Sequence, residues 1–141
     1  MDLMKGKKGL VMGVANERSI AWGISQKLSE AGADLAFTYL DEVIKLFEDI
    51  KSHWGKIDFV VHAVAFSDKS ELSGEYLNTT RENFLRSMLI SCFSFTEVAK
   101  EASKIMEDGG SMLTLTYEST KAIPNYNVMG VCKSALEASV K

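Results

Sequence analysis

Gly9-Leu10-Val11-Met12-Gly13-Val14 is a short apolar run that ends in a glycine turn. A run of this kind, without polar alternation, is typical of a strand that is buried on both faces of a sheet. Ser19, a good helix N-cap, follows it and opens an amphipathic segment from Ile20 to Ala31 that ends at Gly32. This strand-turn-helix order predicts that the run is the central strand of an α/β fold.

The same alternation continues along the chain. The further strands are predicted at Asp34–Tyr39, Ile57–Ala65 and Ser111–Thr116, and the further helices at Asp41–Trp54, from a Thr79/Glu82 capping box to Gly109-Gly110, and after Pro124. Alternating strands and helices imply parallel strands joined by right-handed crossovers. We therefore predict one domain over residues 1–141, a Rossmann-like doubly wound parallel sheet. The sheet is incomplete, with about four strands in the order 2-1-3-4 and helices on both faces.

Composition excludes several classes of protein. The chain has 141 residues and a formal net charge of -3, and its scattered lysines argue against a nucleic-acid surface. Cys92 and Cys132 have no partners at metal-ligand spacing, so we expect reduced thiols and no metal site. His62 is expected to be a strand residue that is hydrogen-bonded locally. No signal peptide or membrane-spanning run is apparent, so we expect a soluble, cytoplasmic protein without nucleic-acid or membrane partners.

A tyrosine and a lysine stand seven positions apart in Asn125-Tyr126-Asn127-Val128-Met129-Gly130-Val131-Cys132-Lys133. Seven residues are close to two helical turns, so both side chains leave one face, about 10.5 Å apart along the axis. The Tyr126 phenol can donate a proton to a reacting oxygen, and the Lys133 ammonium can hold a cofactor sugar and supply positive charge. The pair is typical of a reductase site, although an ordinary surface pair has the same spacing.

The glycine turn Gly13–Gly23 is a candidate phosphate site. It lets the backbone pass close to a ligand and directs amides toward the helix start at Ser19, where a pyrophosphate would be stabilised. It is not a G-x-G-x-x-G fingerprint, and an ordinary strand-to-helix turn has the same features. Gly13, the loop after Val64 and the turn after Thr116 all fall at the carboxyl ends of predicted strands, where ligands bind in such sheets.

Four strings occur in one order along the chain. They are the glycine turn, Val61–Asp68, Phe84–Phe95 and Pro124–Gly130. Together they closely resemble the bacterial NADH-dependent enoyl-[acyl-carrier-protein] reductases of type II fatty-acid synthesis, within the short-chain dehydrogenase/reductase superfamily. The resemblance runs from Lys5 to Lys141 with gaps. It implies reduction of trans-2-enoyl thioesters on acyl carrier protein, with NADH as the cofactor.

The resemblance also implies roles for single residues. Tyr126 would donate a hydrogen bond or proton to the thioester oxygen, and Lys133 would hold the nicotinamide ribose and favour charge on that oxygen. Tyr117 matches a second site tyrosine near the substrate, or else it is a strand-end aromatic that fills the cleft wall. The remaining matches are Gly13, Ser19, Ile20 and Val64 at cofactor-binding positions and Ser67 where the substrate meets backbone.

Relative to the family, the chain is shortened internally and at its carboxyl terminus. The resemblance implies a further helix and strand between Tyr39 and Val43, which this sequence lacks, and the sequence stops at Lys141 where relatives continue. The strands Leu35–Tyr39 and Met112–Leu115 would then be apolar sheet edges, which invite pairing with other chains. We therefore expect self-association, and the resemblance implies a homo-oligomer in which the long helix supplies core or subunit interface.

Three functional hypotheses stay open from the sequence. The first is an NADH-dependent enoyl reductase, and the second is a catalytically inactive remnant that acts at most as a self-associating or binding module. The third, a flavodoxin-like binding module, does not account for Tyr126 and Lys133. Asp41 and Glu42 favour NADH over NADPH if they accept a hydrogen bond from the adenosine ribose, but they could equally be carboxylates at a helix N-terminus.

Overall fold

The computed structural model of the chain describes residues 2–38, 43–118 and 120–141. These residues form two compact units, the first from Met1–Ala63 and Glu97–Thr114 and the second from Val64–Thr96 and Leu115–Lys141. Asp41 and Glu42, together with the predicted start of their helix, lie outside the described residues. None of the helices that the structure describes has the length and apolarity that a bilayer crossing requires.

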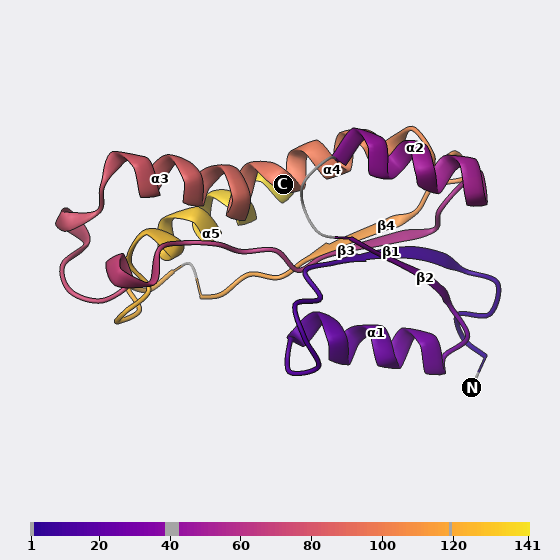
Figure 1. Cartoon of the computed structure of the whole chain (residues 1–141), viewed down its shortest axis with the longest axis horizontal. Coiled ribbons are helices and arrows are strands. Elements are labelled where there is room, and N and C mark those ends of the chain that lie inside the picture. Colours follow the sequence, from indigo (N-terminus) through magenta and orange to yellow (C-terminus); the bar gives the residue numbers. More distant parts are fainter. Residues whose placement is uncertain (1, 39–42, 119) are drawn as a thin grey trace. The chain divides into compact units, whose positions relative to one another are not determined.

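The first unit contains a parallel sheet of four strands (Figure 1). The strands are β1 (Lys8–Met12), β2 (Asp34–Thr38), β3 (Phe59–His62) and β4 (Ser111–Thr114). Their order is β2-β1-β3-β4, which confirms the predicted order and the predicted central position of β1. In the register of the two inner strands, Leu10 lies beside Val60 and Val11 beside Val61.

Helices α1 (Ile20–Glu30) and α2 (Val43–Trp54) lie on opposite faces of this sheet (Figure 1). Val11, Phe59 and Val61 pack with Ala21 of α1. Because side chains alternate along a strand, the neighbouring strand residues point to the other face. Those residues, Leu10, Met12, Val60 and His62, are also buried. Burial on both faces explains why these strands are continuously apolar rather than alternating.

His62 is fully buried in this sheet and is hydrogen-bonded to the neighbouring strand. Its Nδ1 lies 3.0 Å from the Thr114 hydroxyl, and that hydroxyl donates to the His62 carbonyl at 3.2 Å. Since the hydroxyl proton is used in the second bond, Nδ1 carries the proton of the first. The predicted local hydrogen bonding of His62 is therefore confirmed.

The second unit is built around helices α3 (Arg81–Met88) and α5 (Asn127–Val140). Two short 3-10 turns, η1 (Lys69–Glu71) and η2 (Tyr76–Asn78), precede α3. The predicted long helix is interrupted, since a π-helical turn η3 (Leu89–Phe93) separates α3 from α4 (Ser94–Ser103). A π-helical turn contains an additional residue relative to an α-helical one, so the helix changes phase at this point.

The predicted Thr79/Glu82 capping box is wrong. Thr80 is the N-cap of α3, and its hydroxyl accepts a hydrogen bond from the Asn83 amide at 3.2 Å. The Thr79 hydroxyl instead donates to the Tyr76 carbonyl at 2.7 Å. In a capping box the third helical residue would bind the N-cap amide, but here Glu71 accepts that hydrogen bond from Thr80 at 2.9 Å. A carboxylate from outside the helix has taken the place of Glu82.

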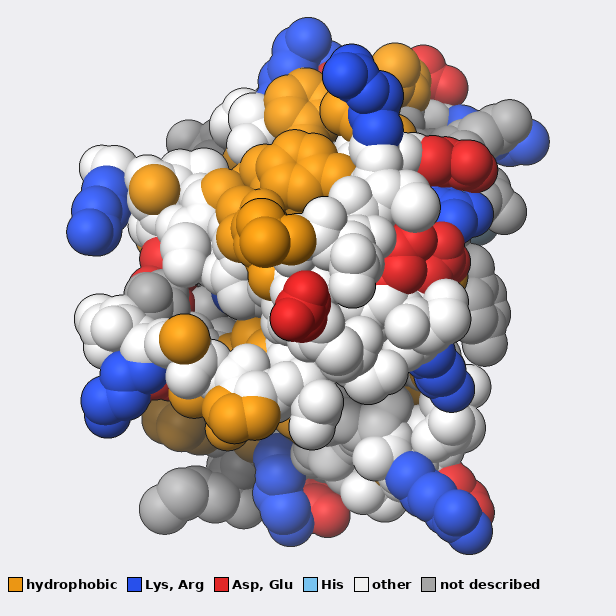
Figure 2. Space-filling model, turned by 90° about the vertical axis from the view of Figure 1, so that its left-hand side faces the viewer, with side chains coloured by type: hydrophobic (Ala, Val, Ile, Leu, Met, Phe, Trp, Pro, Cys, Tyr) orange, Lys and Arg blue, Asp and Glu red, His pale blue; other side chains and the backbone are white. Residues whose placement is uncertain are grey.

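The apolar residues of the second unit divide between a core and a surface. Val128, Met129 and Cys132 of α5 are buried and pack with half-buried residues that include Phe84 and Met88 of α3. On the surface of the unit, hydrophobic side chains remain exposed at Tyr76, Leu77, Leu85, Leu89 and Phe93. Figure 2 shows one face of the molecule on which hydrophobic side chains gather, with Lys and Arg around them. The unit therefore combines a small apolar core with an apolar surface.

Candidate active site

The glycine turn of the first unit depends on close contact between two chain segments. Gly13 has φ +87, and a Cβ at this position would lie 2.0 Å from the Ala63 carbonyl oxygen. The Ala63 amide donates to the Met12 carbonyl at 3.2 Å, which holds the two segments together. Only glycine fits between the ends of β1 and β3, and this requirement exists without any ligand.

The turn leads into the N-terminus of α1. Ser19 is the N-cap, since its hydroxyl accepts from the Trp22 amide at 3.2 Å and donates to the Asn16 carbonyl at 2.7 Å. No acidic residue lies in the first turn of α1. The positive end of the helix dipole is thus uncompensated by a carboxylate of that turn, which suits an anion. Ile20, the first residue of the predicted amphipathic segment, is 71% exposed.

In the second unit, Val64 and Ser67 lie on the loop that follows β3. Val64 is buried, and Ser67 is half-buried. The Ser67 hydroxyl lies 3.2 Å from the Asn83 amide nitrogen and 3.4 Å from its amide oxygen. Asn83 is completely buried. It was not identified as a site residue from the sequence.

Tyr126 is the N-cap residue of α5, one position before the first helical residue. Its ring contacts the ring of Tyr117, with centroids 5.2 Å apart and planes tilted by 59°. A Cβ on Gly130 would lie 3.7 Å from Tyr126 Cδ1, so the ring extends along the first turn of α5. Burial, with smaller contributions from Tyr117 and Cys132, raises the pKa of Tyr126. The phenol is therefore protonated at neutral pH and can donate a hydrogen bond.

Lys133 lies two turns further along α5 and is only 5% exposed. Its ammonium donates to the Leu115 carbonyl at 2.8 Å. Burial lowers the pKa of Lys133, and the thiols of Cys132 and Cys92 oppose this with smaller effects. An ammonium has three donors, and this contact uses one of them. Lys133 is thus not a surface residue, which removes the surface-pair interpretation of the motif.

A cleft of about 360 Å³ opens beside Tyr126 in the second unit. Apolar, amide and charged groups line it, and they come from η2, from the loop before α5 and from the first two turns of that helix. The lining includes Glu118, Lys121, Ile123, Asn127 and Val131. Tyr126 and Tyr76 thus contribute phenols to a pocket wall that mixes apolar surface with a few polar groups, which is typical of a small-molecule site.

The predicted site residues are distributed over both units. Gly13, Ser19 and Ile20 belong to the first unit, where they follow β1. In the second unit the structure brings Tyr117 into contact with Tyr126 and places Lys133 further along the helix that Tyr126 caps. The first unit can bind an anion at the N-terminus of α1. The second unit can stabilise negative charge on an oxygen with a phenol and a buried ammonium.

The shifted pKa of Tyr126 leads to a spectroscopic prediction. The tyrosinate absorbance that disappears in a Tyr126→Phe variant should titrate above the ordinary value of 10.0. Because the folded-state pKa is raised, protonated Tyr126 contributes stability that is complete below pH 10.0 and is lost as pH rises through the folded-state pKa. Difference titration of wild type against Tyr126→Phe measures this, with Tyr117→Phe as the neighbouring control. A Tyr126 titration at or below 10.0 would contradict it.

Comparison with known proteins gives one consistent result. The family model described as enoyl-(acyl carrier protein) reductase matches residues 13–45 and 40–141. The NADH enoyl-[acyl-carrier-protein] reductase 2 of Rhizobium meliloti strain 1021 is 52% identical over 168 residues, which cover 99% of this chain and 63% of that protein. The NADH enoyl-[acyl-carrier-protein] reductase FabI of Bacillus cereus is 44% identical over 172 residues, covering 100% of this chain and 67% of that protein.

Solved structures agree. The reductase of Anaplasma phagocytophilum in complex with NAD superposes with a TM-score of 0.95 at 48% identity, over 99% of this chain and 65% of that one. FabI of Candidatus Liberibacter asiaticus has the same TM-score, identity and coverage. This chain spans less than two thirds of the length of the first relatives, with 63% for the Rhizobium protein. The aligned span of 168 residues exceeds the 141 of this chain, and the family match is divided at residues 40–45, so relatives carry additional residues near this point.

Proposed function

Because the chain belongs to the enoyl-(acyl carrier protein) reductase family, we propose that it reduces the trans-2 double bond of an enoyl thioester carried by acyl carrier protein. The observation that carries this proposal is the buried Lys133 ammonium on the helix that Tyr126 caps. A buried cation and a protonated phenol are the groups that stabilise charge developing on an oxygen. The comparisons favour this function over an inactive remnant and over a flavodoxin-like module.

Each unit carries residues that suit one part of a dinucleotide cofactor. The first turn of α1 lacks an acidic residue, and Ser19 and Ile20 would hold the pyrophosphate there beside the Gly13 turn. Lys133, with one donor used by Leu115, would hold ribose hydroxyls with the others, and buried Val64 would flank the cofactor with an apolar surface. When bound, NADH supplies the hydride that reduces the substrate β-carbon.

Tyr126 and Lys133 act on the oxygen of the thioester. Reduction at the β-carbon leaves enolate charge on that oxygen. Tyr126 holds its proton at neutral pH and would donate it, or a hydrogen bond, to the enolate oxygen. Lys133 supplies positive charge from a buried position, where water screens it poorly. Tyr117 packs against the Tyr126 ring and would restrict its orientation, and Ser67 would contact the substrate.

Two further properties are part of the proposal. The exposed side chains of Leu85, Leu89 and Phe93 follow each other at intervals of four residues, which supports a homo-oligomer that covers them. Phe37 of β2 and Leu113 of β4, both on edge strands, are about half exposed and support self-association through the sheet edges as well. Cys92 and Cys132 are both free and buried, which supports a reducing, cytoplasmic location.

The test is a direct assay of the chain. Purified protein is mixed with NADH and a crotonyl thioester, and the loss of NADH absorbance is followed. We expect consumption of NADH that depends on the enoyl thioester, whereas the saturated butyryl thioester gives none. Binding of NADH without oxidation by the enoyl thioester would contradict the proposed reaction.

A further inference from the structure

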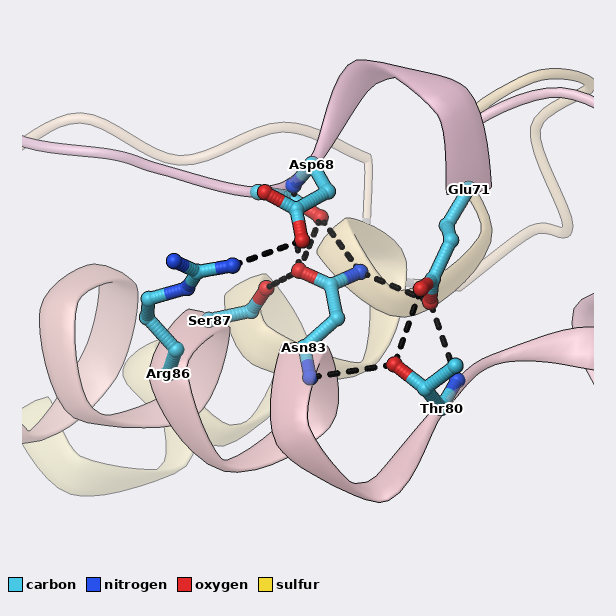
Figure 3. Close-up of polar contacts among 7 residues, drawn as sticks. Asp68, Glu71, Thr80, Asn83, Arg86 and Ser87 are labelled. Atoms are coloured by element: carbon cyan, nitrogen blue, oxygen red, sulfur yellow. Dashed lines mark hydrogen bonds and ion pairs between the residues drawn. The ribbon is translucent and has the colours of Figure 1, made fainter.

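Asn83 is a buried hub that connects α3 to the loop carrying Ser67 (Figure 3). Its amide oxygen accepts from the Asp68 amide at 3.0 Å and from the Ser87 hydroxyl at 3.1 Å. Its amide nitrogen donates to the Glu71 carboxylate at 3.0 Å and to the Ser67 hydroxyl at 3.2 Å. A completely buried amide would be unfavourable without partners, and here both ends are satisfied.

The chemistry of Glu71 fixes which way the Asn83 amide points. The Glu71 carboxylate accepts from the Thr80 amide at 2.9 Å and from the Thr80 hydroxyl at 2.8 Å. The hydrogen bond from the Thr80 amide, followed by those from Asn83 and the Thr80 hydroxyl, lowers the pKa of Glu71. An ionised carboxylate can only accept, so the nitrogen of Asn83 must face Glu71, and its oxygen faces the Asp68 amide.

Two other residues of the same helical segment, Ser91 and Arg86, bind the residues on either side of Ser67. The Ser91 hydroxyl accepts from the Phe66 amide at 2.9 Å and donates to the Phe66 carbonyl at 3.0 Å. Arg86 pairs with the Asp68 carboxylate at 2.7 Å and lies over the Phe66 ring, 5.2 Å from its centroid. The backbone on both sides of Ser67 is therefore anchored. Asn83 hydrogen-bonds both to the side chain of Ser67 and to the amide of Asp68, the next residue.

We propose that Asn83 is a positioning residue that sets Ser67 for contact with the enoyl thioester. This inference rests on the proposed function, which gives Ser67 its substrate. The amide nitrogen of Asn83 holds the Ser67 hydroxyl, and its amide oxygen holds the backbone amide of Asp68. Ser67 is therefore held in place before substrate binds. Preorganised groups bind with a smaller loss of conformational freedom, so the contribution of Asn83 falls on substrate binding rather than on the chemical step.

The test exchanges the amide and the carboxylate between the hydrogen-bonded residues Asn83 and Glu71. Asn83→Asp is nearly isosteric but brings a second carboxylate against Glu71, where the donor stood 3.0 Å away. We expect the KM for the crotonyl thioester to rise about ten-fold, with kcat changed by less than about two-fold. Adding Glu71→Gln removes the repulsion between the two carboxylates and should lower KM by at least about three-fold relative to Asn83→Asp. The Thr80 amide donates to the same Glu71 oxygen as Asn83 does, so full return to the wild-type KM is not expected.

A second measurement reports on the loop without turnover. Exchange of the Asp68 amide hydrogen should be faster in Asn83→Asp, because repulsion from the Glu71 carboxylate displaces the side chain that accepts from this amide, and slower again in the double variant. Ser87→Ala is the matched control, since Ser87 contacts Asn83 but not the loop, and it should leave KM unchanged. If Asn83→Asp does not fold, Asn83→Ser, which loses the donor to Glu71, should raise KM in the same way.

The outcomes are separable. Unchanged KM and Asp68 exchange in the folded Asn83 variants would overturn the role of Asn83, and so would a folded double variant whose KM is no lower than that of Asn83→Asp. Absence of enoyl-dependent NADH consumption in the wild-type chain would overturn the proposed function and this inference with it. The first failure appears only in the variants and the second already in the wild type.

Discussion

Replacing Lys133 by methionine should lower kcat/KM for the enoyl thioester by about 100-fold or more while the chain stays folded. Lys133 is only 5% exposed, and methionine keeps its unbranched stem but removes the ammonium. The loss of the buried charge removes a desolvation penalty, whereas the Leu115 carbonyl loses its partner, and these two effects on stability oppose each other. The proposed reaction has no such compensation, because Lys133 supplies its charge from a buried position, where water screens it poorly.

The measurement is steady-state NADH oxidation together with thermal unfolding of the same samples. Lys27→Met is the matched control, because the Lys27 side chain is 79% exposed and pairs with Glu30 on the surface of α1. This control should retain the wild-type kcat/KM. If Lys133→Met keeps more than about half of the wild-type value, charge at this position does not support the reaction.

The second large effect is on stability. Gly13→Ala should lower the free energy of unfolding by about 3 kcal/mol or more, because it combines an unfavourable backbone conformation with a clash. Gly13 has φ +87, and the new Cβ would lie 2.0 Å from the Ala63 carbonyl oxygen. That oxygen is main chain at the end of β3, so it cannot move away without disturbing the hydrogen bond between Ala63 and Met12.

Gly55→Ala separates the two causes. Gly55 has φ +75, but nothing lies within 4 Å of the position a Cβ would take. This variant should lose only the conformational part, about 1 kcal/mol. Denaturant unfolding followed by circular dichroism gives both values. Equal losses for the two variants would show that the close approach of Ala63 does not constrain this turn.

The sheet was predictable because its determinants are local. Continuous apolar runs such as Leu10–Met12 and Phe59–Val61 identify strands buried on both faces, and one alternation of strands with helices permits few topologies. The start of α3 was not predictable in the same way. The Thr80 amide at the N-cap donates its hydrogen bond to Glu71, which lies nine residues earlier. No short-range sequence pattern indicates that contact.

The candidate site was only partly accessible from the sequence. The spacing of Tyr126 and Lys133 predicts a shared helix face, but the burial of Lys133 follows from the packing of α5 and not from its neighbours in sequence. Asn83, Ser87 and Ser91 recur every four residues, which is a helical signal. Small polar residues are normally assigned to the surface, so this signal pointed away from the interior, where the structure buries all three.

The π-helical turn between α3 and α4 has a consequence for which residue types the helix tolerates. Upstream of the turn the buried positions of α3 are polar, at Asn83 and Ser87. Downstream they include the large apolar residues Phe95 and Val98 beside Ser94 and Glu101. Each residue advances a helix by roughly 100°, so the additional residue rotates everything downstream relative to a regular helix. Deleting a single residue from Leu89–Phe93 would therefore rotate Phe95, which the second unit buries, out of its present position. Insertions or deletions should be tolerated less well there than substitutions.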